Sequence, residues 1–134
     1  MMMLVWISLA AIAVVLGVIR LAPVDPLDWN AQPELNEDKE FRGGGFRVIR
    51  TGPDGLHHFN QIATKAPRTK LLTGSVEDGM ATYVTRTKVI GFPDYTTARQ
   101  DGDLLKVYAR LRFGRSDLGS NKSRIDRWLA KMPG

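Results

Sequence analysis

The stretch from Leu104 to Met132 constrains the fold more than any other part of the chain. Its first half alternates strictly between apolar residues and cationic or aromatic ones, which predicts a β-strand over residues 104–113 with one buried and one polar face. Its second half has apolar residues at i, i+3, i+4 and i+7 from Ile125, which predicts an amphipathic C-terminal helix. Turn and capping residues link the two halves, and Ser120 or Asn121 is the expected N-cap.

The N-terminal residues 1–19 form an almost wholly apolar run without a charged side chain. A helix of this length spans about 29 Å, at about 1.5 Å per residue, which matches the hydrocarbon core of a bilayer. We therefore expect a transmembrane anchor over residues 1–20, or a signal sequence over the same residues. An anchor is favoured because no Lys or Arg precedes the run and no small-residue cleavage site directly follows it.

The remaining chain divides by composition. Residues 21–45 are rich in proline, acidic residues and glycine, which predicts an extended stalk in which Trp29 packs on the domain or lies at the membrane interface. Residues 46–134 are expected to form an α+β domain. It should contain an antiparallel sheet, one helix before that sheet and the C-terminal amphipathic helix. Beyond a short strand over 46–49, the expected elements are a helix over 56–66 and strands over 69–73, 81–90 and 95–99.

Several kinds of site are excluded by residue content. The chain has no cysteine, so disulfides and thiolate metal sites are absent. His57 and His58 are adjacent, so on a helix they point about 100° apart and cannot easily face one metal. No Ser-His-Asp arrangement, no paired carboxylates and no metal-ligand spacing occur. We therefore assign no catalytic residue, no metal and no cofactor.

The net charge of +5 is unevenly distributed. Residues 20–40 carry two cationic and six acidic side chains, whereas residues 86–134 carry eleven cationic and five acidic ones. A basic C-terminal half suggests an anionic partner, or docking of one part of the chain on the other. Nucleic acid is a poor candidate, since the apolar N-terminus, the acidic stalk and the lack of aromatics among the basic residues all argue against it.

The basic residues predict a charged sheet face. The strand over 104–113 places Arg110 and Arg112 on its polar face, and Arg86 and Lys88 share that face if their strand is its neighbour. Cations gathered in this way repel one another unless something negative lies among them.

Three arrangements would relieve that repulsion. Asp94 and Asp117 could reach in from loops and form a structural network. A phosphate or carboxylate group could bind there, assisted by the N-terminus of the last helix. The cations could also simply face water. For the bound anion, the candidate ligand-binding residues are Arg86, Arg110, Arg112, Arg115, Ser116, Asn121 and Arg124.

Two blocks of sequence resemble a known family. Thr-Tyr-Val-Thr-Arg-Thr-Lys-Val-Ile-Gly-Phe-Pro-Asp-Tyr (82–95) and Tyr-Ala-Arg-Leu-Arg-Phe-Gly-Arg-Ser-Asp-Leu-Gly-Ser-Asn-Lys-Ser-Arg (108–124) are similar to the bacterial and plastid family called domain of unknown function 1499. The residues standing in the family's places are Arg110, Arg112, Gly114, Ser116, Asp117, Leu118, Gly119, Asn121 and Arg124. The sequence departs from the family at Ala109 and Leu111, where serines are usual, at Ser120 in place of valine, and at Lys122 in place of arginine.

The resemblance implies a small envelope or thylakoid-lumen protein with an N-terminal membrane segment or signal. It implies no activity. We therefore expect a single-pass inner-membrane protein with a periplasmic domain, which contacts the membrane through residues 1–19 and binds an anionic ligand or a protein partner without catalysis. The alternative is an enzyme that acts on a phosphorylated or acyl substrate with Asp117 and arginines.

Overall fold

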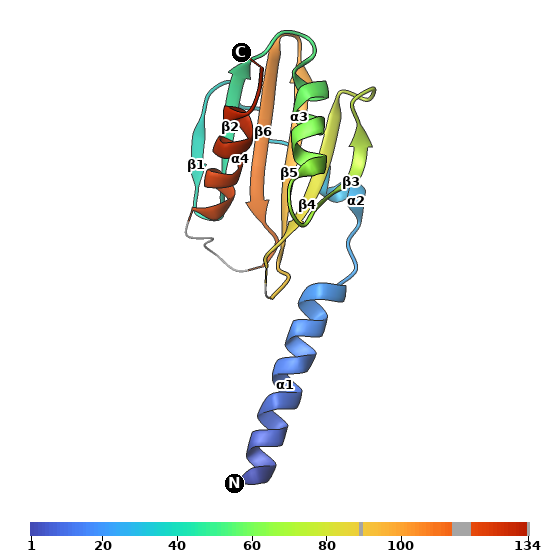
Figure 1. The fold of residues 1–134 in the computed structure, drawn as a ribbon, viewed down its shortest axis with the longest axis vertical. Coiled ribbons are helices and arrows are strands. Elements are labelled where there is room, and N and C mark those ends of the chain that lie inside the picture. Colours follow the sequence, from blue (N-terminus) through green and yellow to red (C-terminus); the bar gives the residue numbers. More distant parts are fainter. Residues whose placement is uncertain (89, 114–118, 134) are drawn as a thin grey trace.

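The chain folds into an N-terminal helix and an α+β domain built on an antiparallel sheet, as predicted. A computed structural model describes residues 1–88, 90–113 and 119–133. Its helices are α1 (Met2–Leu21), α2 (Pro26–Trp29), α3 (Gly55–Lys65) and α4 (Ser120–Ala130). Its strands are β1 (Lys39–Phe41), β2 (Gly44–Arg50), β3 (Thr69–Ser75), β4 (Met80–Arg86), β5 (Pro93–Asp101) and β6 (Leu104–Leu111). The six strands lie in the order β1-β2-β6-β5-β4-β3, and α1 projects from one end of the sheet (Figure 1).

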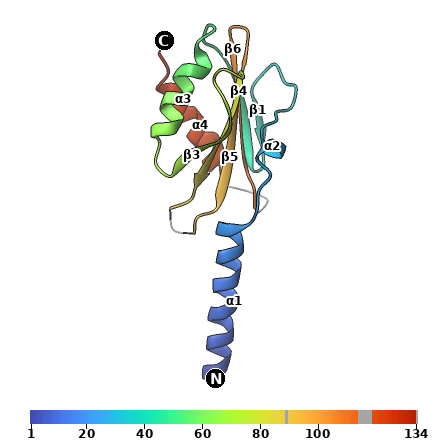
Figure 2. The same cartoon turned by 90° about the vertical axis from the view of Figure 1, so that its right-hand side faces the viewer.

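The hydrophobic core lies between the sheet and the layer formed by α3 and α4 (Figure 2). The predicted apolar face of β6 supplies Leu105, Val107 and Ala109, and all three side chains are fully buried. The apolar stripe of α4 packs beside them, with the Trp128 ring 5.7 Å from the ring of Phe59 on α3. The two periodicities of the 104–132 stretch thus meet in one core.

The opposite face of the sheet is covered by the segment that we expected to be an extended stalk. Residues 21–45 instead contain α2, β1 and the beginning of β2. Trp29 packs on the domain, stacked on Tyr95 with ring centroids 4.3 Å apart. The side chain of Gln32 donates to the carbonyls of Thr97 and Lys106, each at 2.7 Å. The proline, acidic and glycine content of this segment indicated a stalk. Its partners lie more than sixty residues later in the chain, so local composition does not report them.

Gly44 and Gly45 of the glycine run at 43–45 belong to β2, and Gly43 lies in the turn before this strand. Gly44 opens β2 and pairs with Arg110 of β6. A Cβ atom on Gly44 would lie 1.8 Å from the carbonyl oxygen of Ala109, so no larger residue fits there. This glycine therefore reflects a close approach between two backbones.

Several element boundaries differ from the predictions. The strand expected over 81–90 ends at Arg86, and the short strand expected over 95–99 runs from Pro93 to Asp101. The N-cap of α4 is Gly119, whose φ of +83° suits glycine, and neither Ser120 nor Asn121 caps this helix. The helix expected before the sheet, α3, lies between β2 and β3 in the chain.

Candidate functional site

The structure separates the predicted anion-binding residues into two groups on opposite faces of the sheet. β5 lies between β4 and β6, so the strands carrying Arg86 and Arg110 are not neighbours, and the condition for a shared cationic face is not met. Arg110 and Arg112 lie on the face that carries Trp29, whereas Asn121 and Arg124 lie on α4, across the sheet. Arg86 is the last residue of β4, and its side chain donates to the carbonyl of Gly91. The predicted residues Arg115, Ser116 and Asp117 fall outside the described residues.

Backbone carbonyls accept hydrogen bonds from Arg110 and Arg112 on the Trp29 face, whereas Arg99 of β5 pairs with the carboxylate of Glu34 at 3.6 Å. Arg110 donates to Thr97 Oγ1 at 2.7 Å and to the carbonyl of Trp29, and its guanidinium lies 5.2 Å from the Trp29 ring centroid. Arg112 donates to the carbonyls of Ala22 and Pro23. These two arginines therefore attach the segment that follows α1 to the sheet.

Desolvation is the main electrostatic effect at Arg110. Burial lowers the pKa of Arg110 to about 10, which leaves the guanidinium charged at neutral pH. Tyr108 lies below it, with its ring centroid 4.6 Å from the guanidinium carbon. Aromatic faces and carbonyl oxygens stabilise this cation where no ion pair to it is found among the described residues.

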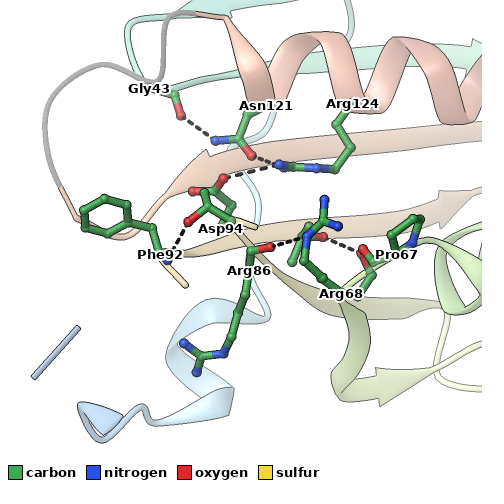
Figure 3. A network of polar contacts seen from close by, with 11 residues as sticks. Gly43, Pro67, Arg68, Arg86, Phe92, Asp94, Asn121 and Arg124 are labelled. Atoms are coloured by element: carbon green, nitrogen blue, oxygen red, sulfur yellow. Dashed lines mark hydrogen bonds and ion pairs between the residues drawn. The ribbon is translucent and has the colours of Figure 1, made fainter. Parts of the chain in front are cut away.

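The predicted acidic residue Asp94 lies on the helix face, where it pairs with Arg124. Their closest atoms are 3.4 Å apart, and the side chains are only 6% and 11% exposed. Asn121 accepts from Arg124 at 2.7 Å and donates to the carbonyl of Gly43 (Figure 3). The network therefore joins α4, β5 and the turn before β2.

A second feature near Arg124 is a groove of about 390 Å³ between α4, the end of α3 and the adjoining ends of β3 and β4. We call it the basic groove. Its lining includes the cationic residues Arg68, Arg86, Lys88, Arg124, Arg127 and Lys131. No acidic residue is found in the described part of its wall, and Ser120 at the first turn of α4 completes one side.

The cationic side chains of the basic groove differ in how they are held. Arg68 donates from Nε to the carbonyl of Arg86 at 3.1 Å. The side chain of Arg86 points away from Arg68 and Arg124 (Figure 3) and donates to the carbonyl of Gly91 at 3.0 Å. Lys88 and Arg127 are exposed, and neither has an ion pair within the described residues. The described residues therefore neutralise the charge of the groove only in part.

The two flanks of α4 differ in charge balance. On the flank toward β1 and β2, Lys122 pairs with Glu40 at 3.0 Å and Asp126 pairs with Arg47 at 2.8 Å. The hydrogen bonds from Lys122 and Arg47 hold the pKa of Glu40 below its ordinary value. The flank toward the basic groove carries cations at 124, 127 and 131 and no acid. The groove is thus a local excess of positive charge rather than a general property of this helix.

Arg68 adds a conformational feature to the groove. Its φ of +55° makes it the one described non-glycine residue in the left-handed region. That conformation costs an ordinary residue about 1–2 kcal/mol. It also places both the backbone and the side chain of Arg68 against the end of β4, since its carbonyl accepts from Arg86 N at 3.0 Å.

Sequence reasoning missed Arg68, Arg127 and Lys131. The spacing of Ser120, Arg124, Arg127 and Lys131 at i, i+4, i+7 and i+11 puts them on one stripe of α4, and this signal was present in the sequence. Arg68 gave no such signal, because its place depends on a single backbone conformation after Pro67.

One known protein family matches most of the chain. A family model described as a protein of unknown function (DUF1499) matches residues 19–132. The chain belongs to the domain of unknown function 1499 family. The resemblance noted in its two sequence blocks is confirmed, and the DUF1499 match also covers the Trp29 segment and both helices of the core. No curated protein and no solved structure matches this DUF1499 chain.

Two further observations bear on the function of this DUF1499 protein. Helix α1 is long and apolar enough to cross a membrane, and none of its residues is buried. Across residues 1–88, 90–113 and 119–133, no group of three or more His, Asp or Glu side chains is placed to hold a metal ion.

Proposed function

We propose that this protein is a membrane-anchored, non-catalytic binding domain that takes an anionic ligand in the basic groove. The observation that carries the proposal is the groove itself, in which cationic residues from three elements line one hollow without a described acid. Its volume of about 390 Å³ lies in the range of small-molecule sites. A phosphate-type anion matches the chemistry, because guanidinium groups bind its oxygens through paired N–H donors.

The proposal changes the set of ligand-binding residues expected from the sequence. Arg124 stays in the site as part of its wall, and Arg68, Lys88, Arg127 and Lys131 join it. Arg110 and Arg112 leave it, because they bind backbone carbonyls on the other face. The enzyme alternative gains no support, since Asp94 is engaged with Arg124 and Asp117 lies outside the described residues.

Anchoring through α1, rather than cleavage after it, fits the contacts at its end. Arg20 donates from Nε to the carbonyl of Ile90 at 2.9 Å, and Ala22 and Pro23 accept from Arg112. Residues directly after the apolar run are thus bonded into the folded domain. We place the domain on the periplasmic side of an inner membrane. A C-terminal alkaline phosphatase fusion tests this, because it becomes active only when exported.

The binding proposal is tested with the full-length protein in zwitterionic micelles. Inorganic phosphate is titrated by isothermal calorimetry, with chemical shifts of residues 68, 88 and 120–131 followed by NMR. We expect saturable binding that weakens as salt rises, and an affinity about tenfold or more lower in Lys88→Gln/Arg127→Gln.

The matched control is Arg50→Gln/Lys70→Gln, which removes two exposed cations that do not line the groove. It should bind like the wild type. Absence of heat and of shifts up to about 10 mM phosphate, or equal weakening in both double variants, would refute the binding proposal.

A further inference from the structure

We propose that the anion taken by the basic groove is the phosphate headgroup of an anionic phospholipid in the bilayer that α1 spans. The domain then sits on the membrane with the groove rim at headgroup level. This inference rests on the proposed function, because both assign an anion to the same groove, and it adds the source of that anion.

The position of the groove relative to α1 is the first argument. β4 ends at Arg86, and residues 87 and 88 continue into the groove wall at the end of the sheet from which α1 projects (Figure 1). The carbonyl of Ile90 accepts from Arg20 at 2.9 Å. Two residues of extended chain span at most about 7 Å, so Lys88 lies that close to the residue that Arg20 contacts.

The length of α1 sets the level of the membrane surface. Its 20 residues extend about 30 Å, which equals the hydrocarbon thickness of a typical bilayer. Arg20 then lies at the boundary of the hydrocarbon. Since the headgroup layer adds about 5–7 Å on each side, Lys88 on the groove wall falls within it.

Hydrogen bonds and packing contacts hold the domain in this position relative to α1. Arg112 donates to the carbonyls of Ala22 and Pro23, on the opposite side of the connection from Arg20. Gly91 has φ +80°, and a Cβ atom there would lie 2.9 Å from Arg20 Nε, so the arginine packs directly against the glycine backbone. The groove therefore keeps its distance from the membrane surface.

The charged residues in the turns of the domain are cationic near α1 and acidic at the far end, and this arrangement favours contact with an anionic membrane surface. The end next to α1 carries Arg42, Arg68, Arg86, Lys88 and Arg112 in its turns and strand ends. The turns at the far end carry the acids Asp54, Glu77, Asp78, Asp101 and Asp103. Asp25 and Asp28 follow α1, but they lie in the α2 segment, which covers the opposite face of the sheet from α4 (Figure 2).

An apolar contact accompanies the charges. Ile90 is 39% exposed on the turn between β4 and β5, beside Lys88 and against the end of α1. Surfaces that bind membranes peripherally combine such an apolar side chain with cations that bind acidic headgroups. A free phosphate or a phosphorylated peptide would not make use of Ile90, which favours the lipid.

The experiment uses full-length protein in nanodiscs of phosphatidylcholine, with or without about 30 mol % phosphatidylglycerol. Hydrogen exchange is measured for residues 84–92 and 120–131. We expect slower exchange in both segments when phosphatidylglycerol is present, reversed by high salt. In Lys88→Gln/Arg127→Gln the affinity of the groove for the anionic surface should fall about 30-fold, because each cation near such a surface contributes a factor of about five. Protection of both segments at about 30 mol % phosphatidylglycerol should therefore be lost in this double variant.

The control Arg50→Gln/Lys70→Gln should behave like the wild type in the same nanodiscs. If inorganic phosphate protects the groove in pure phosphatidylcholine nanodiscs but phosphatidylglycerol does not, the anion site stands and its assignment to a lipid is wrong. If a phosphorylated peptide protects the groove and phosphatidylglycerol does not, the partner is a protein. If none of these protects it, both proposals fail.

Discussion

Arg110 offers the sharpest test of how the segment after α1 is attached to the sheet. In Arg110→Met the side chain keeps its length and apolar stem but loses the charge and the donors. The guanidinium bonds to Thr97 Oγ1 and the Trp29 carbonyl disappear, as does the contact with the Trp29 ring. Hydrogen bonds from charged donors contribute about 1.5–3 kcal/mol each, and a cation–π contact about 0.5–2 kcal/mol.

Two effects reduce the net loss below the sum of those contributions. Methionine avoids the desolvation of a largely buried cation, which costs several kcal/mol. The Thr97 hydroxyl still donates to the Trp29 carbonyl at 2.9 Å, so neither group is left without a partner. We therefore expect Arg110→Met to lower the free energy of unfolding by about 1–3 kcal/mol, or about 4–12 °C in Tm for a domain of this size.

Thermal unfolding of the full-length protein measures the global effect, and hydrogen exchange over residues 22–38 measures the local one. Relative to the wild type, Arg110→Met should accelerate exchange over residues 22–38 more than it accelerates exchange in the core strands. Lys70→Met is the matched control, because Lys70 is an exposed cation on the same face of the sheet. An unchanged Tm together with unchanged exchange over residues 22–38 would show that Arg110 does not attach the segment.

Three further predictions concern the core and the junction with α1. Burial raises the pKa of Tyr83, so the neutral Tyr83 side chain stabilises the fold fully below about pH 10, and this stabilisation is lost as the pH rises further. Calorimetry from about pH 8 to 11 should therefore show a steeper fall in Tm for the wild type than for Tyr83→Phe. Gly79→Ala, which has open space at its Cβ, should lower the free energy of unfolding only by the backbone strain of about 1–2 kcal/mol. Gly91→Ala has the same φ but its Cβ meets Arg20, so it should lower the free energy of unfolding further, as measured by urea unfolding. Trp128→Ala should cost about 3–5 kcal/mol in the same assay, and a loss below about 1 kcal/mol would contradict its place in the core.

The elements that follow one clear periodicity were predictable. β6 and α4 came directly from alternation and from the i, i+3, i+4, i+7 stripe. Leu105, Val107, Ala109, Ile125 and Trp128 are buried as predicted, and Leu129 and Met132 are partly buried against them. Local patterns suffice here because each pattern reports a face that a single apolar core covers. The family blocks were also readable, since they lie in these same elements.

The burial of residues on the polar face of β6 could not be predicted from the sequence. Lys106 reads as an exposed residue, yet it is 2% exposed and its ammonium contacts Asp101 at 3.0 Å and Asn36 at 3.2 Å. Arg110 likewise reads as a surface cation and is covered by Trp29. Long cationic side chains are compatible with either environment, and the covering segment is remote in sequence, so no local pattern distinguishes the two.

The basic groove was only half predictable for a related reason. Arg124 and Lys88 belong to the two blocks that resemble the family, whereas Arg68 reaches the groove from a turn that no periodicity describes. The sequence located the start of β3 at Thr69, as observed, but placed the end of the next strand at residue 90 instead of Arg86.

The strand order has a consequence for the biosynthesis of the protein. β2 pairs with β1 on one side and with β6 on the other, and roughly fifty residues separate β2 from β6. At about 5–20 residues per second, the hairpin of β1 and β2 waits several seconds after leaving the ribosome before its second partner has been made. During that interval one edge of β2 is unpaired, and the Trp29 segment has no sheet on which to pack. The domain therefore assembles only after β6, its last strand, has been made.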